Sequence, residues 1–401
     1  MTKLLLGASA LVFATPAWAE IYEVEPGEGA QERLQEALIL AEPGDEIVLG
    51  AGRFVLTDGI SLDVDDVTVR GVGMDATILD FTTQAGAGEG FLITSDDVTL
   101  RDFAVENPKG DGIKSKAADN IVFYRLRVTW TEGPKPTNGA YGVYPVEGTG
   151  VLIDSVVVSG ASDAGVYVGQ SKDITVRNSI AQYNVAGIEI ENSRNAIVEN
   201  NMTLHNTGGI LVFDLPDLPV MGGGDVIVRK NLVTTNNTPN FAPAGNIVAG
   251  IPKGTGVMVM ANDNVLVENN LIAENDTAQV MVIAYSQTFT DARYDPYPRN
   301  VLIGENLYTG GGKDPYLPGA EMLLAAFGGS LPDVLWDGLA KEGTPALFAV
   351  EGTRGWSLNL PVQGQGVANA QPGPMVVDTP ASLILDQVTG APAELAARIA
   401  G

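Results

Sequence analysis

Two glutamates with a spacing of one residue are the first candidates for chemistry in this chain. Glu189 and Glu191 alternate with isoleucine in Gly187-Ile-Glu-Ile-Glu, so both side chains project from one face of a strand. At the usual rise of a strand, this spacing separates the two carboxyl groups by about 7 Å. Such a pair suits the acid and base of a glycoside hydrolase, because their repulsion raises one pKa. A solvated acidic face is the plainer interpretation.

Lysines and tyrosines at equivalent positions of earlier segments suggest a different chemistry. Lys114 and Lys116 belong to one such segment, and Tyr144 and Tyr167 belong to the next two. In a lyase or epimerase acting on a uronate, a lysine would neutralise the substrate carboxylate or take the C5 proton, with a tyrosine as acid or base on the other face. Lys114 and Glu189 lie three rungs apart, about 14 Å, so they cannot share one proton transfer. The two chemistries are therefore alternatives.

The segment after the glutamates ends in Phe213 and Asp214, which could contact a substrate. Asp214 could also join Glu189 and Glu191 as a third acid. Calcium prefers several oxygen ligands, so this acidic trio is a candidate calcium site. No other cofactor is indicated, and the sequence leaves the choice between calcium and no cofactor open.

Methionines and the single histidine complete the list of candidates. Met258, Met260 and Met281 carry thioethers that suit Cu(I), so a copper-site accessory protein is a third interpretation. An apolar patch covered by the C-terminal segment explains these methionines more simply, because the chain has no cysteine and no histidine nearby. His205 falls in a turn, and we expect a structural, hydrogen-bonded role for it.

Internal repetition predicts the elements that position these residues. Short β-branched segments begin at Asp97, Asn120, Gly150, Asp173, Asn195, Asp225, Asn264 and Asn300. A second strand precedes most of them, beginning at Gly112, Gly142, Gly165, Gly187, Gly209, Gly256 and Gln279. The closest recurrences are 22 to 23 residues apart, which suits a coil of three short strands. We therefore predict an all-β fold, a single-stranded right-handed parallel β-helix whose bends carry stacked asparagines.

The alternation of each second strand predicts which side chains face outward. The expected interior column is Ile113, Val143, Val166, Ile188, Ile210, Val257 and Val280. One outward row is then Lys114, Tyr144, Tyr167, Glu189, Leu211, Met258 and Met281, and a second is Lys116, Val146, Gly169, Glu191, Phe213, Met260 and Ile283. Insertions at 131–140, 214–224, 235–254 and 286–299 would wall this strip into a groove. We expect the groove to bind an extended polysaccharide or oligosaccharide.

The two ends of the chain have different compositions from the repeat. Residues 1–19 resemble a secretory signal peptide, because a lysine and a short apolar stretch precede Ala17-Trp-Ala. The repeat occupies 20–309 and starts with a capping helix over 31–41. Residues 310–401 are expected to form an irregular C-terminal cap and tail, with a short helix over 392–400.

Composition narrows the environment and the partners. The chain has 401 residues, no cysteine and a net charge of −26, so a large core must replace disulfides. Strong acidity argues against nucleic acid as a partner. No later segment has the roughly 18 unbroken apolar residues that span a bilayer, so we expect no membrane insertion. The expected location is the periplasm or the extracellular space.

Two sets of residues resemble a known superfamily. Leu34-Gln-Glu-Ala-Leu followed by Pro43-Gly-Asp-Glu-Ile-Val-Leu resembles the opening of many secreted pectin-lyase-like β-helix proteins. Asn206-Thr-Gly-Gly-Ile-Leu-Val-Phe-Asp-Leu-Pro, with Asn237-Thr-Pro-Asn-Phe-Ala-Pro and Gly254-Thr-Gly-Val-Met-Val-Met, resembles a bacterial family of exported parallel β-helix repeat proteins with no assigned reaction. The resemblance covers roughly residues 28 to 305, and it implies fold and export.

Motifs of the enzymes in this superfamily are missing from the sequence. The paired aspartates and Gly-His-Gly of polygalacturonase-like hydrolases are absent, as is the Asp-Pro-His-Asp of alginate epimerases. Three functions therefore stay open: a polysaccharide lyase, epimerase or hydrolase; a non-catalytic glycan-binding or envelope scaffold; and a periplasmic copper accessory protein.

Overall fold

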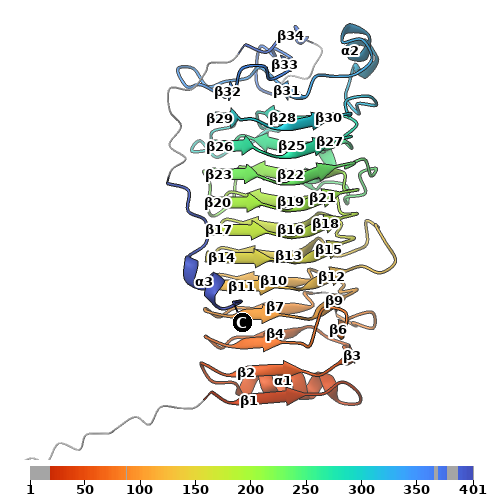
Figure 1. Ribbon diagram of the computed structural model, residues 1–401, viewed down its shortest axis with the longest axis vertical. Helices are drawn as coiled ribbons and strands as arrows, with labels where there is room; N and C mark the ends of the chain where they lie inside the picture. The colour runs from red at the N-terminus through yellow and green to blue at the C-terminus, as the bar shows by residue number, and fades with distance from the viewer. Residues whose placement is uncertain (1–18, 87, 365–368, 377–386, 401) are drawn as a thin grey trace, which may run out of the picture.

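The chain winds into a right-handed parallel β-helix, as its sequence predicts (Figure 1). The computed structural model describes residues 19–86, 88–364, 369–376 and 387–400. Three sheets run along the molecule, and each complete coil contributes one strand to each sheet. Within the described residues, neighbouring strands pair in parallel, and β33 and β34 form the one antiparallel pair.

The three sheets are named A, B and C. Sheet A contains β1 (Ile21–Val24), β2 (Glu46–Leu49), β5 (Thr68–Arg70), β8 (Thr99–Arg101), β11 (Ile121–Tyr124), β14 (Thr149–Asp154), β17 (Lys172–Arg177), β20 (Arg194–Glu199), β23 (Gly224–Arg229), β26 (Asp263–Glu268), β29 (Arg299–Ile303) and β32 (Leu347–Ala349). Sheet B contains β3 (Gly52–Val55), β6 (Thr77–Asp80), β9 (Ala104–Glu106), β12 (Arg127–Thr129), β15 (Val157–Ser159), β18 (Ile180–Gln182), β21 (Met202–Leu204), β24 (Leu232–Thr234), β27 (Leu271–Ala273) and β30 (Leu307–Thr309). Sheet C contains β4 (Ile60–Leu62), β7 (Phe91–Ile93), β10 (Ile113–Lys116), β13 (Tyr141–Val146), β16 (Ala164–Gly169), β19 (Ala186–Glu191), β22 (Gly208–Phe213), β25 (Thr255–Met260), β28 (Ala278–Ile283), β31 (Val334–Trp336), β33 (Gly355–Ser357) and β34 (Gly373–Pro374).

The interior of the coil is a stack of aliphatic side chains in register. Ile113 pairs with Val143, Val143 with Val166, and Val166 with Ile188. All four are fully buried, and the column continues through β22, β25 and β28. Like residues therefore stack on like residues and exclude water along the whole axis, which is the main source of stability in a fold without disulfides.

A column of glycines stands at the start of most strands in the middle of sheet C. A Cβ atom on Gly142 would lie 2.2 Å from Cγ1 of the core residue Val158 and 2.6 Å from the carbonyl oxygen of Gly165 in the next coil. Gly187 and Gly256 would meet the next coil's carbonyl oxygen at 2.5 and 2.3 Å. Because these positions point inward and touch the neighbouring backbone, only glycine fits them.

Buried asparagines hold two other bends together. In one ladder the Nδ2 atoms of Asn201, Asn231 and Asn270 each donate to the Oδ1 atom of the asparagine one coil further on, at 2.9 to 3.1 Å. A second ladder, which the sequence did not reveal, contains Asn184, Asn206, Asn236 and Asn275. These side chains also satisfy buried backbone groups at the bends, so the coils are tied together by hydrogen bonds as well as by packing.

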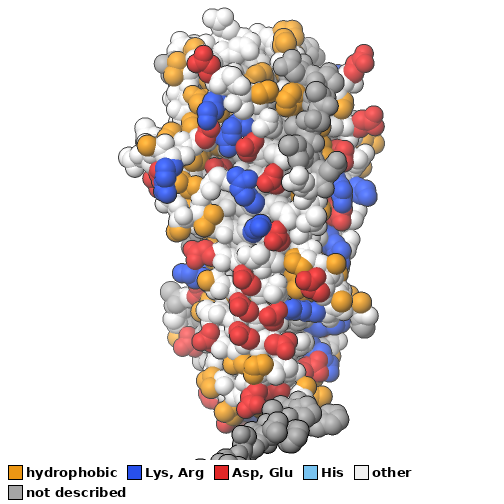
Figure 2. Space-filling view, turned by 90° about the vertical axis from the view of Figure 1, so that its left-hand side faces the viewer, with side chains coloured by type: hydrophobic (Ala, Val, Ile, Leu, Met, Phe, Trp, Pro, Cys, Tyr) orange, Lys and Arg blue, Asp and Glu red, His pale blue; other side chains and the backbone are white. Residues whose placement is uncertain are grey.

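Charged side chains pair along the outer surface of sheet A. Arg177 donates to Asp154 at 2.6 Å, and Arg229 donates to Glu199 at 2.8 Å, each pair bridging adjacent strands. Figure 2 shows both signs of charge interspersed in the upper part of this face, whereas acidic side chains predominate in the middle of its lower part. Paired charges of this kind solvate the face and discourage stray association, and their contribution to stability is small.

Caps close the two ends of the helix. Helix α1 (Ala30–Leu40) buries Leu34, Ala37 and Leu38 against the first coil, within one residue of the predicted boundaries. Helix α2 (Ala320–Ala326) lies at the opposite end (Figure 1).

The parallel ladders extend beyond the predicted boundary at residue 309. Strand β31 pairs with β28, β32 with β29, and β33 with β31, so another partial coil forms before the chain becomes irregular. The repeat spacing is lost there because 24 residues (310–333) separate β30 from β31. Sequence periodicity therefore underestimates the length of the helix.

The C-terminal tail returns along the outside of the molecule. Helix α3 (Ala393–Ala397) lies beside β11 and β14 (Figure 1). Leu395 is fully buried against Val122 and Leu152 on the outer face of sheet A. Arg398 forms an ion pair with Asp97 at 2.7 Å.

The predicted signal peptide, residues 1–19, lies outside the described residues except for Ala19. In the part of the chain that the structure describes, no helix is both long and apolar enough to cross a membrane.

Candidate functional site

Both predicted outward rows exist on sheet C in the expected register. Lys114 pairs with Tyr144, Tyr167 pairs with Glu189, and Glu189 pairs with Leu211. The second row runs in the same way, with Glu191 between Gly169 and Phe213. The rows differ sharply in exposure along their length, because loops and the C-terminal segment cover different parts of them.

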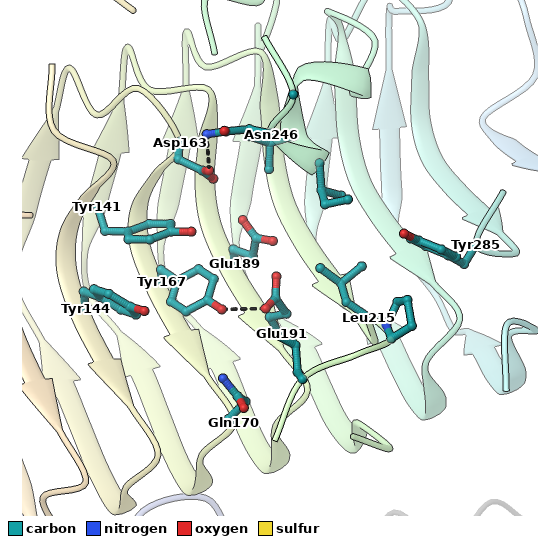
Figure 3. A pocket seen from close by; sticks show the side chains of 15 residues that line it. Tyr141, Tyr144, Asp163, Tyr167, Gln170, Glu189, Glu191, Leu215, Asn246 and Tyr285 are labelled. Carbon is teal, nitrogen blue, oxygen red and sulfur yellow. Dashed lines mark hydrogen bonds between the residues drawn. The ribbon is translucent and has the colours of Figure 1, made fainter. Parts of the chain in front are cut away.

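A pocket of about 450 Å³ opens on the outward face of β13, β16 and β19 (Figure 3). Its floor carries Tyr141, Tyr144, Tyr167, Glu189 and Glu191. The two walls come from the predicted insertions, through residues 215–218 on one side and 245–248 on the other. The volume lies in the range of small-molecule sites, so a compact ligand fits better than the long groove that the sequence suggested.

Three tyrosines pack together at one end of the pocket. The ring centroids of Tyr141 and Tyr144 are 4.5 Å apart, and those of Tyr141 and Tyr167 are 4.4 Å apart. The Tyr167 hydroxyl donates to Oε1 of Glu191 at 2.6 Å. Burial raises the pKa of all three phenols, so they are neutral hydrogen-bonding groups at physiological pH. Tyr167 is therefore a poor general base in this state.

Glu189 and Glu191 sit side by side on β19, with only 1% and 7% of their surfaces exposed. Burial raises the pKa of Glu191 to about 7. Burial, followed by the charge of Glu191, raises the pKa of Glu189 well above its usual value. A hydrogen bond between the two carboxyl groups raises the pKa of Glu189 and lowers that of Glu191, so the pair shares a proton that Glu189 holds more tightly.

This geometry corrects the predicted separation of about 7 Å, which assumed side chains perpendicular to the strand. The two carboxyl groups instead lean together in the pocket and lie within hydrogen-bonding reach of each other. They therefore form one acidic unit, unlike the two separated carboxyl groups of a standard glycosidase pair.

Asp163 supplies a third carboxyl group that the sequence interpretation missed. It accepts a hydrogen bond of 3.2 Å from Nδ2 of Asn246, which lies on the opposite loop (Figure 3). Burial, and then the charge of Glu191, raise the pKa of Asp163 to about 7. The pairing with Asn246 depends on how the loop over 235–254 folds back, so no local pattern could have identified it.

Tyr141 was missed for a different reason, which the sequence does contain. Gly142 points inward at the bend, so the residue before it points outward, next to Tyr144. Strict alternation counted back from the inward residue Val143 would place Tyr141 on the inside, so the predicted outward rows did not include it. Gln170 and Tyr285 also line the pocket, and both lie at strand exits outside the predicted rows.

The predicted lysines do not join this pocket. Lys114 forms ion pairs with Glu89 at 2.9 Å and Asp111 at 3.6 Å, and its Nζ lies 4.8 Å from the ring centroid of Tyr144. Lys116 is exposed one row further along the strand. Lys114 and Tyr167 therefore do not share one open cleft, which the uronate lyase or epimerase hypothesis required.

The predicted roles of Phe213 and Asp214 are also wrong. Phe213 is fully buried and is not among the described residues that line the pocket, so it does not present its ring to a substrate there. Asp214 accepts hydrogen bonds of 2.9 Å from the backbone N–H groups of Gly222 and Gly223, which anchors the loop. Among the described residues no group of three or more acidic or histidine side chains has the geometry of a metal site, so the acidic trio with Asp214 does not form a calcium cage.

The methionines and the histidine lie away from the pocket. Met258, Met260 and Met281 are buried in a cluster with Leu335 and Trp356 of the C-terminal segment. They are therefore not open to an incoming copper ion, and the apolar-patch interpretation describes them.

His205 occupies a turn with φ of 58°. Its Nδ1 atom lies 3.4 Å from Oγ1 of Thr235, and its ring stacks on Tyr183 with 5.2 Å between centroids. These contacts agree with the structural role expected for it.

A family model described as the right handed beta helix region matches residues 55–215 and 136–292. The A-module of the mannuronan C-5 epimerase AlgE4 from Azotobacter vinelandii is 16% identical, with 82% of this chain and 94% of that chain covered and a TM-score of 0.56. The N-terminal fragment of bacteriophage Phi29 gene product 12 is 12% identical, with 80% of this chain and 59% of that chain covered and a TM-score of 0.53. DFA-IIIase from Arthrobacter chlorophenolicus A6 is also 12% identical, with 82% of this chain and 98% of that chain covered and a TM-score of 0.50.

No curated protein sequence matches the chain. Identities of 12 to 16% show a shared fold and leave the chemistry to the site itself. The family model spans more than half of the chain, and the structural neighbours have the pectin-lyase-like architecture that the sequence resembled. The chain belongs to the family of right-handed parallel β-helix proteins.

Proposed function

We propose that this protein binds a saccharide in the pocket over β13, β16 and β19 and cleaves a glycosidic bond there by acid catalysis. The observation that supports this most is the buried Glu189–Glu191 pair, which shares a proton beside a platform of tyrosine rings. A carboxyl group with a pKa near 7 is protonated in about half of the molecules at neutral pH, and a general acid needs this protonated form.

The protonated member of the pair would donate its proton to the glycosidic oxygen as the bond to the leaving sugar breaks. Positive charge then develops at the sugar ring, and the remaining negative charge of the pair stabilises it. Asp163 is the third carboxyl group of the pocket and could accept the proton of the attacking water. The tyrosine rings offer flat apolar faces to the sugar, while neutral hydroxyls remain for hydrogen bonding.

Hydrolysis fits the pocket better than chemistry on a uronate does. No lysine or arginine is among the described residues that line the pocket, so nothing there neutralises a substrate carboxylate. A uronate would instead be repelled by Asp163, Glu189 and Glu191. The similarity to a mannuronan epimerase supports saccharides in general as ligands of this architecture, without extending to its substrate.

The test is an incubation of purified protein with a panel of neutral and uronate polysaccharides, with and without calcium. We expect new reducing ends from a saccharide without uronate, and a loss of at least about 100-fold in rate for Glu191→Gln. Glu23→Gln, on an exposed position of β1, is the matched control and should retain the rate. The hydrolase proposal fails if no member of the panel is cleaved, or if Glu191→Gln cleaves as fast as the wild type.

A non-catalytic glycan-binding site is the second candidate, and the three-tyrosine platform supports it. In that case oligosaccharide affinity should fall in Tyr144→Ala and Tyr167→Ala while no product forms with the wild type. Calorimetry on both variants, with the same panel, distinguishes this function from hydrolysis. Unchanged affinity in both variants would remove this candidate.

We also propose that the protein is exported and cleaved after Ala19. The backbone N–H of Glu20 donates to Oδ1 of Asp45 at 2.7 Å, and β1 begins one residue later. A new amino terminus at Glu20 would therefore carry its positive charge next to a carboxylate. N-terminal sequencing of protein from the periplasm or medium should read Glu20-Ile-Tyr, and retention of residues 1–19 would contradict the proposal.

A further inference from the structure

The proposed saccharide pocket carries an unbalanced charge. Asp163, Glu189 and Glu191 all line it, and its described lining contains no basic side chain. Lys114 is the cation beside the tyrosine platform, and two other carboxylates, Glu89 and Asp111, already hold it. A ligand that brought its own positive charge would therefore meet three carboxyl groups without a competing cation.

Glu189 is the residue that most needs such a ligand. It is 1% exposed, and its Oε2 atom has no hydrogen-bond partner in the described structure. The two neighbouring carboxyl groups do have hydrogen-bond donors, because Glu191 accepts a hydrogen bond from Tyr167 and Asp163 accepts one from Asn246. Figure 3 shows the Glu189 carboxyl group pointing into the pocket between them. A buried acceptor without a donor is unfavourable, so this oxygen marks the place for a ligand's donor.

The walls of the pocket suit a cation as well as a sugar ring. Tyr141, Tyr144 and Tyr167 pack within 4.9 Å of one another between ring centroids. The faces of such rings attract ammonium groups, and a carboxylate next to them adds charge-assisted hydrogen bonds. Both features lie on the floor of the same pocket.

We infer that the saccharide bound here carries a free amine, and that its ammonium group sits against the Oε2 atom of Glu189. An ammonium group has three donors and no acceptor, which matches a cluster of carboxyl oxygens. The inference rests on the proposed saccharide-binding function and names its ligand class: amino sugars with an unacetylated nitrogen.

Proton release is a consequence of this assignment. The titratable groups that face Glu189 are Asp163, Glu191 and the pocket tyrosines, and Asp214 acts on Glu191 from the adjacent loop. Asn246 and Gln170 face the pocket as neutral amides. An arriving ammonium favours the ionised forms of Glu189 and Asp163, so its binding at pH 7 should release protons, whereas a neutral sugar should release none. Glu191 keeps the proton that hydrolysis requires.

The experiment compares oligosaccharides of glucosamine, N-acetylglucosamine and glucose of equal length by titration calorimetry at pH 7. Two buffers with different ionisation enthalpies report the number of protons released. For wild-type protein we expect the glucosamine oligomer to bind at least ten-fold more tightly than the other two, with proton release. Glu189→Gln keeps the shape of the side chain and should remove both the preference and the proton release.

Net charge needs its own control, because a chain with a charge of −26 attracts any polycation. Glu23→Gln removes one exposed negative charge without altering the pocket and should leave the preference unchanged. A preference that Glu189→Gln does not alter, or that disappears in 0.5 M salt (a Debye length of only about 4 Å), would reflect surface attraction and overturn the inference.

The outcomes separate this inference from the proposed function. If the glucose or N-acetylglucosamine oligomer binds as tightly as the amine, the amine inference is wrong and saccharide binding stands. If none of the three binds and no polysaccharide in the panel is bound or cleaved, the proposed function fails as well.

Discussion

The hydroxyl of Tyr167 donates a hydrogen bond of 2.6 Å to Oε1 of Glu191, and both side chains are buried. The two residues are 24 positions apart in sequence and lie on adjacent strands, β16 and β19. The bond stabilises the ionised form of Glu191 and lowers its pKa, opposing the larger effect of burial. The tyrosine thus controls how strongly the acidic pair holds its proton.

Replacing Tyr167 with phenylalanine should move the titration of the acidic pair upward. Loss of the hydroxyl removes the contribution that lowers the pKa of Glu191, while burial remains. Carbon-13 NMR of the glutamate carboxyl groups should show the shift, and the pH profile of any hydrolysis should move in the same direction. Tyr144→Phe keeps the Tyr167–Glu191 bond and serves as the control. Identical titrations for wild type and Tyr167→Phe would contradict the role assigned to this bond.

The protein should be more stable at pH 5 than at pH 8. Burial raises the pKa of Glu191, Asp163 and Asp337 to about 7, against about 4 in an unfolded chain. Between these values the folded state binds more protons than the unfolded state, so the free energy of unfolding decreases as pH rises from about 4 through 7. Thermal melts should show a lower Tm at pH 8. Glu189→Gln should reduce the difference, and a Tm that rises from pH 5 to pH 8 would rule out this linkage.

The asparagine ladder should be more important for stability than its exposed neighbours. Asn231 accepts from both the N–H and the Nδ2 of Asn201, and its own Nδ2 donates to the carbonyl oxygen of Val198 and to Asn270. Asn231→Ala leaves several buried groups without partners and should cost about 2–4 kcal/mol in the free energy of unfolding. Asn200→Ala, at an exposed left-handed position, should cost about 1–2 kcal/mol. Urea unfolding measures both, and equal losses would argue against the ladder.

The glycine column should tolerate no side chain. In Gly256→Ala the new Cβ would lie 2.3 Å from the carbonyl oxygen of Gln279 in the next coil. We expect insoluble protein or a loss of more than about 3 kcal/mol, because both partners are backbone held in two ladders. Gly250→Ala places its Cβ in open space and should fold normally. Expression and thermal melting compare the two, and equal stability would show that the coils can separate more than the geometry implies.

The sequence by itself determined the fold and the register of the outward rows. Val143, Val166 and Ile188 recur at the spacing of one coil, and a parallel β-helix stacks equivalent positions on one another. Strict alternation then places Tyr167 and Glu189 side by side on the outside. Both consequences are local, because period and alternation act along a single strand and its two neighbours.

Only the tertiary structure decided which residues of these outward rows are buried and which line a pocket. Asn246 meets Asp163 because a long insertion folds back over sheet C, and its path depends on packing that no repeat specifies. The same covering removes water from Glu189 and Glu191, so they share a proton instead of standing apart as two solvated charges. The burial of a side chain depends on all the chain segments that pack around it, whereas sequence periodicity describes one segment at a time. For that reason the fold could be predicted from the sequence and the pocket could not.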